Sequence, residues 1–269
     1  MPNKFPRIGA NQGARFSHCK KFSKWQIAYA LSRWSRHSIV CPQSQILVGF
    51  TPKAGCSFAA KVFFDNTPNH NTEDYEDWPH PYRQHYQRKN PTELIHWLQS
   101  DITAVKFVRN PFSRAVSSYF QAMRTQLKEV IGQALATNSM DWSFHQFLCW
   151  LASTRLDFSN PHFGPQKFWG EGSLFHFQDI IKIEEVSDQI VLKSGKKLTV
   201  APSARYSRHH VQRGKPAGYC GDLPFSALQD EASIFPDWQH FYNCGTSKLV
   251  AELYKKDFLA YDYPLSITN

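Results

Sequence analysis

Short apolar runs alternate with amphipathic stretches along most of this chain. The run at 46–50 suits a buried parallel strand, and the run at 105–108 does so too, apart from its Lys106. After each run the chain passes through a polar turn and then resumes apolar residues at helical spacing, at 57–64 and from Phe112 onward. The pattern predicts two strand–turn–helix units. Alternating strands and helices favour a parallel sheet with helices on both faces.

The remaining pattern predicts further elements and one long interruption. Residues 65–90 are rich in His, Tyr, Pro and charge and follow no clear period, so we expect a long irregular insertion of the kind that often carries function. A length of 269 residues suits one domain, which we place at 45–269 after an N-terminal extension and helix at 1–44. Other helices are expected over 20–36, 92–98, 141–151, 184–192 and 246–258, strands over 174–183, and a basic loop over 201–224.

The turn after the first apolar run has the features of an anion site. Pro52 and Gly55 break the apolar pattern, Lys53 supplies a positive charge, and Ser57 places a hydroxyl in the first helical turn. A helix N-terminus favours anions through its unpaired backbone N–H groups and its dipole. The order of residues differs from a Walker A loop, in which the lysine follows the second glycine. An ordinary strand–turn–helix with a solvated Lys53 is the alternative.

The turn after the second run has a similar character. Arg109 ends the run, Pro111 suits the start of a helix, and Ser117 lies about two helical turns further on. Arg109 and Ser117 could reach one phosphate beside the helix, because Arg forms bidentate charge-assisted bonds and Ser adds a neutral donor. The alternative is that Arg109 and Arg114 pair with surface carboxylates. Two such turns predict a ligand with phosphates at two ends.

Composition narrows the class of partner. The net charge of +9 and the pI of about 9.2 imply an anionic partner, and because the positive charges are dispersed, a bisphosphorylated nucleotide or an anionic glycan explains them as well as nucleic acid does. The six cysteines show no metal-ligand spacing. Free thiols are the simplest interpretation, and a Cys220–Cys244 disulfide would suit a secreted protein. No stretch reaches the roughly 18–20 apolar residues of a membrane span, and no apolar signal region opens the chain.

Taken together, the two turns carry a family resemblance. Residues 52–57 (PKAGCS) and 109–117 (RNPFSRAVS) resemble the two cofactor-binding motifs of sulfotransferases that use 3′-phosphoadenosine 5′-phosphosulfate, PAPS. The residues of both motifs are similar to those of the carbohydrate branch that acts on chondroitin, dermatan and the HNK-1 glycan (sulfotransferase family 2). The chain differs from that branch in having Phe163 in place of a usual Trp and Asn110 in place of a common acidic residue. Further stretches resemble the branch in the same order, at 90–98, 162–166, 179–186 and 253–263.

The resemblance implies a fold, a reaction and a set of roles. The fold would be a P-loop-like three-layer sandwich, and the reaction would move the sulfuryl group of PAPS to a carbohydrate or glycolipid hydroxyl, leaving 3′-phosphoadenosine 5′-phosphate (PAP), without a metal. Lys53 would bind the bridging and 5′-phosphate oxygens, while Arg109 and Ser117 would hold the 3′-phosphate. We expect a cytoplasmic, bacterial relative that lacks the Golgi anchor of the animal enzymes and binds no nucleic acid. The 5′-phosphate would be held by Ser57 and the backbone of Ala54, Gly55, Cys56 and Phe58.

A general base is expected to accept the proton of the acceptor hydroxyl. A His or carboxylate with a pKa near 6–7 would suit this role. His162 is the first candidate because it lies in one of the family-like stretches, and His85 and His80, both in the 65–90 insertion, follow it. For each histidine the alternative is an exposed or structurally hydrogen-bonded side chain.

The sequence leaves two rival functions open, and it contains one basic cluster whose role is also open. A small-molecule kinase would use a similar loop but needs Mg²⁺ and a Walker lysine. A non-enzymatic basic nucleotide-binding or nucleic-acid-binding protein would show steeply salt-dependent binding to nucleic acid. Arg208 and its neighbours Arg205, Arg213 and Lys215 could close over a nucleotide or meet an anionic glycan, and a solvated charged loop is the equal alternative.

Overall fold

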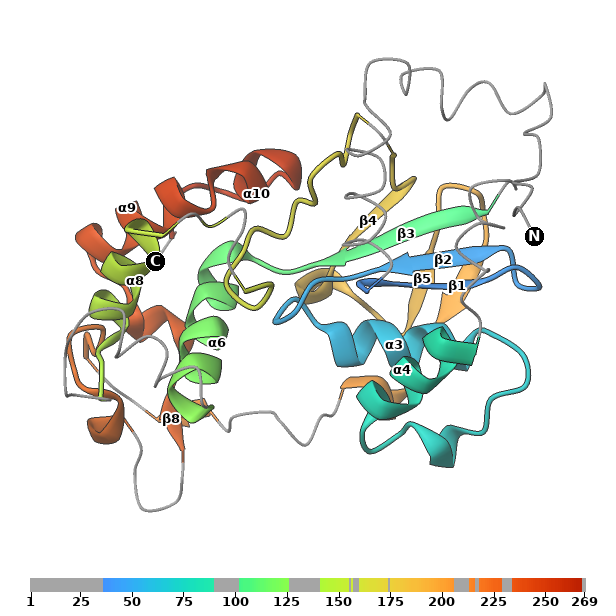
Figure 1. The fold of residues 1–269 in the computed structure, drawn as a ribbon, viewed down its shortest axis with the longest axis horizontal. Coiled ribbons are helices and arrows are strands. Elements are labelled where there is room, and N and C mark those ends of the chain that lie inside the picture. Colours follow the sequence, from blue (N-terminus) through green and yellow to red (C-terminus); the bar gives the residue numbers. More distant parts are fainter. Residues whose placement is uncertain are drawn as a thin grey trace, which may run out of the picture.

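The centre of the molecule is a mixed four-stranded sheet of order β1-β2-β3-β4, in which β2, β3 and β4 run parallel and β1 runs antiparallel to β2 (Figure 1). The predicted α/β fold, with parallel strands flanked by helices, is confirmed, and the antiparallel edge strand is an addition to it. The computed structural model describes residues 36–89, 102–125, 141–154, 156, 160–173, 175–205, 213–215, 218–228 and 234–267. The strands are β1 (Ser38–Cys41), β2 (Ile46–Gly49), β3 (Thr103–Val108) and β4 (Asp179–Lys182).

The two predicted strand–turn–helix units lie side by side in this sheet. Strand β2 is buried along its whole length, and its Val48 pairs with Val105 of β3 in parallel register. Because parallel strands end at the same edge of a sheet, the loops that follow β2 and β3 meet there. The sheet begins at Ser38, ahead of the predicted domain start at residue 45.

One face of the sheet is covered by α3 (Cys56–Asp65) and α4 (Pro79–Lys89), which lie together below the strands in Figure 1. The prediction that 65–90 is wholly irregular is wrong, because this stretch contains the short 3₁₀ helix η2 (Thr72–Asp74) and then α4. Proline is well tolerated where α4 begins. The ring centroids of Tyr82 and Tyr86 lie 4.9 and 5.7 Å from that of Phe64 on α3, so the packed face of α4 is built from tyrosines.

A second group of helices lies beyond the carboxyl end of β3, on the left of Figure 1. Helix α6 begins at Pro111 as predicted, and the Asn110 side chain caps it by accepting from the Phe112 N–H at 2.9 Å. Around Tyr119, this half has a core made largely of aromatic rings. The helices are α6 (Pro111–Arg124), α8 (Phe144–Ala152), α9 (Cys244–Leu253) and α10 (Lys255–Ala260).

Some expected elements differ from the structure. The helix predicted over 184–192 is wrong, because a 3₁₀ turn is followed there by a strand that forms an antiparallel hairpin. The helix predicted over 246–258 is divided at the buried Tyr254, whose hydroxyl donates to the carbonyl oxygen of Phe163 at 2.7 Å. The helices expected over 20–36 and 92–98 lie, except for Arg36, outside the described residues. The short elements are η4 (Ile183–Glu185), β5 (Gln189–Val191), β6 (Lys197–Thr199), η5 (Pro202–Arg205), β7 (Arg213–Lys215), η6 (Phe225–Ala227), β8 (Phe235–Pro236) and η7 (Trp238–Phe241).

The other face of the sheet carries a buried charge. Lys106 points to the side opposite Val105 and Phe107. It is covered by Gln166, Phe168 and Glu171, and by Tyr261, which follows α10. No helix in the part of the chain that the structure describes is both long and apolar enough to cross a bilayer.

Candidate functional site at the carboxyl edge of the sheet

The loop from β2 to α3 is shaped to leave the N-terminus of α3 open. Gly55 adopts a left-handed conformation with φ of 78°, and a Cβ atom at this position would lie 3.1 Å from the Cγ2 atom of Ile183. Helix α3 has no side-chain cap and no acidic residue in its first turn. The N–H of Ala54 donates to the carbonyl oxygen of Thr51 at 3.1 Å, so the turn itself uses that predicted donor. The N–H groups at the start of α3 remain suited to an anion.

Lys53 lies at the centre of this loop. It also adopts a positive φ, 65°, a conformation that is uncommon for residues other than glycine and is often found where a loop holds a ligand. Its Nζ atom lies 3.2 Å from Oε1 of Gln121 on α6, and its carbonyl oxygen accepts from Nη1 of Arg109 at 3.3 Å. The two predicted anion-binding segments are therefore in direct contact.

In the second motif, Arg109 is hydrogen-bonded to a serine other than the predicted Ser117. The Nε atom of Arg109 donates to Oγ of Ser113 at 2.9 Å, whereas Ser117 is half-buried on α6. Among the described residues, none forms a hydrogen bond with the Ser117 hydroxyl. The sequence did not single out Ser113, although its position one helical turn after Arg109 is a signal that could have done so. Burial lowers the pKa of Arg109, and the carboxylate of Glu184 acts in the opposite direction.

Two histidines reach this edge of the sheet from different elements. The Nε2 atom of His80, on α4, lies 2.9 Å from Oγ of Ser57 and 3.9 Å from Sγ of Cys56. The Nδ1 atom of His162 lies 2.7 Å from Oδ1 of Asn160, and the same oxygen accepts from the His162 backbone N–H at 3.0 Å. Because that oxygen can only accept, Nδ1 of neutral His162 carries the proton and Nε2 keeps its lone pair.

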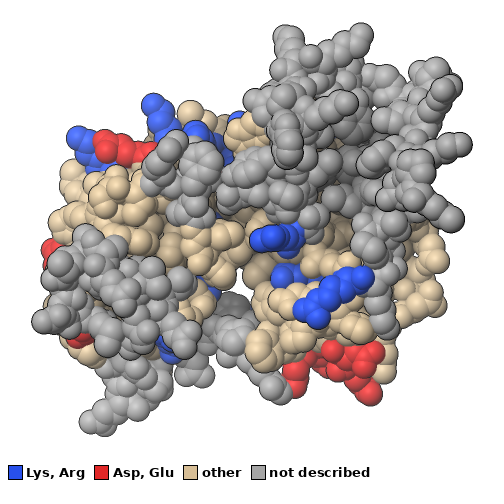
Figure 2. Space-filling view, in the orientation of Figure 1, with Lys and Arg blue, Asp and Glu red and all other residues tan. Residues whose placement is uncertain are grey.

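The environment of both histidines is cationic. Burial lowers the pKa of His162 to about 4, with Lys53, Arg114 and His80 adding to the effect. Burial also lowers the pKa of His80 to about 4, together with Arg83 and Lys53. Both rings are therefore neutral at pH 7 in a setting that favours a bound anion. Figure 2 shows Lys and Arg atoms at the edge of a hollow between the half that holds α3 and the half that holds α6.

Several other predicted residues lie elsewhere or serve the core. His85 is exposed on α4, and its five-residue offset from His80 corresponds to a rotation of about 140° around the helix, so the structure does not bring it to Lys53. The ring of Phe58 packs edge-on against Phe107 at 5.5 Å. Arg205 is exposed and pairs with Asp188 at 3.2 Å. Arg208 lies outside the described residues.

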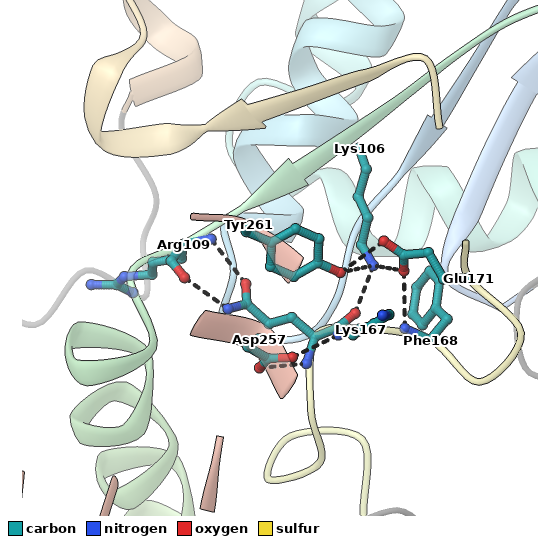
Figure 3. Close-up of polar contacts among 8 residues, drawn as sticks. Lys106, Arg109, Lys167, Phe168, Glu171, Asp257 and Tyr261 are labelled. Carbon is teal, nitrogen blue, oxygen red and sulfur yellow. Dashed lines mark hydrogen bonds and ion pairs between the residues drawn. The ribbon is translucent and has the colours of Figure 1, made fainter. Parts of the chain in front are cut away.

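A polar network behind the site holds the second motif in place (Figure 3). The Gln166 side chain donates from Nε2 to the carbonyl oxygen of Arg109 at 2.7 Å and accepts at Oε1 from the Arg109 N–H at 2.9 Å. Asp257, which is fully buried, accepts from the N–H groups of Gln166 and Lys167, both at 2.8 Å. The sequence marked these residues only through family resemblance, because their partners lie far away along the chain.

Lys106 completes this network on the face of the sheet opposite α3 and α4. Its Nζ atom donates to the Gln166 carbonyl oxygen at 2.6 Å, to Oε2 of Glu171 at 2.5 Å and to the Tyr261 hydroxyl at 2.7 Å. It also lies 3.8 Å from the centre of the Phe168 ring. Burial lowers the pKa of Lys106, and Glu171 acts against that effect.

A model of the sulfotransferase family matches residues 36–264, which includes every element of this site. The chain belongs to the sulfotransferase family. No curated protein and no solved structure matches the chain. The predicted transfer of a sulfuryl group is thus supported at the level of the family, and the kinase and nucleic-acid-binding alternatives are not favoured. Within the described ranges, no group of three or more His, Cys, Asp or Glu side chains of this sulfotransferase is placed to hold a metal.

Proposed function

We propose that this sulfotransferase takes its sulfuryl group from PAPS and transfers it to a hydroxyl of a carbohydrate or glycolipid. The observation that carries the proposal is the bond from Arg109 to the carbonyl oxygen of Lys53, 3.3 Å long, which brings the two predicted anion-binding segments into contact. A nucleotide with phosphate groups at its 3′ and 5′ positions has the charge distribution that such a site would hold. Use of PAPS is also general in the family.

The residues fit the donor in chemical type. The uncapped N-terminus of α3, the Ser57 hydroxyl and the Lys53 ammonium would hold the 5′-phosphosulfate. Arg109 and Ser117 would hold the 3′-phosphate, and the Ser117 hydroxyl has no competing partner among the described residues. PAPS supplies the sulfuryl group in this reaction and leaves as PAP.

Lys53 and His162 would divide the chemistry. The acceptor oxygen forms a bond to sulfur while the bond from sulfur to the bridging oxygen breaks. The acceptor proton passes to Nε2 of His162, whose lone pair is kept available by the bond from Nδ1 to Asn160. Lys53 stabilises the negative charge that develops on the departing phosphate. Bound anionic donor would raise the pKa of His162 from its low value, because it offsets the surrounding positive charge.

The carbohydrate acceptor and the cytoplasmic location are narrower parts of the proposal. The ordered stretches that resemble the carbohydrate branch support the acceptor class. So does Trp78, which is 49% exposed and lies two residues before His80. The described cysteines Cys41, Cys56, Cys149, Cys220 and Cys244 are all free thiols, which supports a reducing compartment.

A thermal-shift titration tests the donor, with PAP compared with AMP, ADP and ATP·Mg²⁺, each with and without EDTA. We expect PAP to stabilise the protein selectively, increasingly with concentration, and independently of EDTA. Equal or better stabilisation by ATP·Mg²⁺ would instead indicate a kinase. Incubation with ³⁵S-labelled PAPS and a panel of neutral and anionic glycans, glycolipids and phenols then tests the acceptor class. Labelling confined to the phenols would refute the carbohydrate assignment.

A further inference from the structure

Arg114 connects the two loops that carry the proposed catalytic residues. Its side chain is buried on α6, with 1% of its surface exposed. Its Nε atom donates to the carbonyl oxygen of Pro52 at 3.2 Å, and its Nη2 atom donates to that of Pro161 at 3.4 Å. These prolines directly precede Lys53 and His162. One guanidinium group therefore holds the backbone next to both proposed catalytic residues.

The same face of α6 continues these contacts. Ser118 donates its hydroxyl to the carbonyl oxygen of His162 at 2.7 Å, and Gln121 accepts from Nζ of Lys53 at 3.2 Å. Arg114, Ser118 and Gln121 are spaced at i, i+4 and i+7, which places them along one side of a helix. Helix α6 therefore presents a row of polar side chains to both loops.

The burial of Arg114 is compensated in a way that fixes its position. The carboxylate of the buried Asp257 interacts electrostatically with it, and the ring of Tyr254 lies 5.8 Å from its Cζ atom. The planar guanidinium directs two N–H donors at a fixed angle, which a lysine ammonium on a flexible stem cannot reproduce. The alternative that Arg114 pairs with a surface carboxylate is excluded, because the side chain is internal.

We propose that Arg114 is a positioning residue that sets the separation of Lys53 and His162 by holding the backbone on either side of the site. The roles of Lys53 and His162 in this statement rest on the proposed function. Arg114 itself touches neither donor nor acceptor in this assignment, and it acts through the Pro52 and Pro161 carbonyl groups. In-line transfer requires the base and the leaving-group cation to be held in one geometry, and small displacements of either have large effects on rate.

Hydrogen exchange measured by mass spectrometry tests the clamp without reference to activity. The variants are Arg114→Lys, which keeps the charge, Arg114→Met, which removes it, and Arg124→Lys as the control on the exposed end of the same helix. We expect both Arg114 variants to exchange roughly tenfold faster in peptides covering 51–57 and 160–166. Exchange in the β5–β6 hairpin should not change, which shows that the fold persists.

The kinetic readout separates positioning from general stability. With PAPS and an accepted acceptor, Arg114→Lys should lower kcat roughly 10- to 100-fold while changing the Kd for PAP much less, because Arg109 and Ser57 remain. Ser118→Ala removes the hydroxyl contacts to the carbonyl oxygens of His162 and, within α6, of Arg114, but it leaves the Pro52 contact in place. It should therefore accelerate exchange in 160–166 but not in 51–57, and lower kcat by less than Arg114→Lys does. This variant carries the test if Arg114→Met does not fold.

Each outcome bears on the inference. Exchange that is unchanged in either loop of Arg114→Lys, or raised equally across the whole protein, overturns the proposal. A kcat equal to that of the wild type in Arg114→Lys overturns it too. If the wild-type protein transfers no sulfuryl group from PAPS while both loops still exchange faster in Arg114→Lys, the proposed function fails and the clamp stands.

Discussion

The Nε2 atom of His80 lies 2.9 Å from the hydroxyl oxygen of Ser57, which joins α4 to the first turn of α3. The contact explains why α4 matters for the site, although its sequence gave little sign of a helix. If the His80 ring donates from Nε2, the Ser57 hydroxyl is left free to donate to a phosphate oxygen. His80 is then a residue that orients Ser57.

This relationship predicts non-additive effects on nucleotide binding. Ser57→Ala should weaken PAP binding roughly tenfold or more, because it removes a hydrogen bond to a charged group. His80→Ala should weaken binding less, and the double variant should behave like Ser57→Ala alone, since His80 acts through Ser57. Isothermal titration calorimetry measures all three. Gln84→Ala, exposed on the same helix, is the control, and multiplicative effects in the double variant would contradict the relationship.

Arg109 should determine the preference for a 3′-phosphate. The wild-type protein is expected to bind PAP much more tightly than AMP, and Arg109→Ala should reduce that ratio to near one, because the bidentate donor is lost. Calorimetric titrations with both nucleotides measure the ratio. Lys248→Ala, an exposed cation on α9, should leave it unchanged. A preference for PAP that survives in Arg109→Ala would show that the second motif has been assigned incorrectly.

The low pKa values of His162 and His80 predict a stability that falls in mild acid. Each pKa is lowered by burial from about 6.5 in the unfolded chain to about 4 in the folded protein. Between these values the unfolded chain binds more protons, so the free energy of unfolding decreases as the pH falls from about 7 to about 4. The decrease should be smaller in His162→Asn and in His80→Asn, and smallest in the double variant. Urea denaturation at a series of pH values measures it, and curves parallel to the wild type would contradict the assignment.

The buried pair of Lys106 and Glu171 should show strong coupling. Lys106→Met leaves a nearly buried carboxylate without its cation and should cost about 3–5 kcal/mol of stability. The combination with Glu171→Gln should cost clearly less than the sum of the two single variants. Urea denaturation completes the cycle. As a control, Arg205→Met breaks the exposed pair with Asp188 and should cost less than about 1 kcal/mol. Additive costs for Lys106 and Glu171 would exclude the coupling.

The elements that sequence predicted well depend on signals within a few residues. The apolar run of β2 and the glycine before α3 mark the first unit, and Asn110 and Pro111 mark the start of α6. Two predictions failed because packing or pairing with distant residues, and not a local apolar pattern, determined the element. The packed side of α4 consists of tyrosines, which do not give an apolar period, and the 184–192 stretch gains its strand only by pairing with β6.

In the candidate site, too, some features followed from the sequence and others only from the fold. Parallel pairing of β2 with β3 is enough to bring the loops of Lys53 and Arg109 together, so their proximity followed from the order of the strands. Which of His80 and His85 lies at the start of α3 depends on how α4 is rotated about its axis against α3. The sequence placed His85 ahead of His80 as a candidate base, whereas the structure brings His80 to the site. Ser113 as the partner of Arg109 likewise emerged only from the fold.

The sequence by itself determined the family, the two candidate anion-binding turns and the chemical types of residue that they carry, because these features are local and repeat a recognisable order. Only the tertiary structure decided which histidines reach Lys53, and that Arg114, Gln166 and Asp257 hold the site from behind. The physical reason is that these contacts join residues distant along the chain. Each buried charge or amide is stable only when packing supplies its partner, and no local pattern specifies that partner.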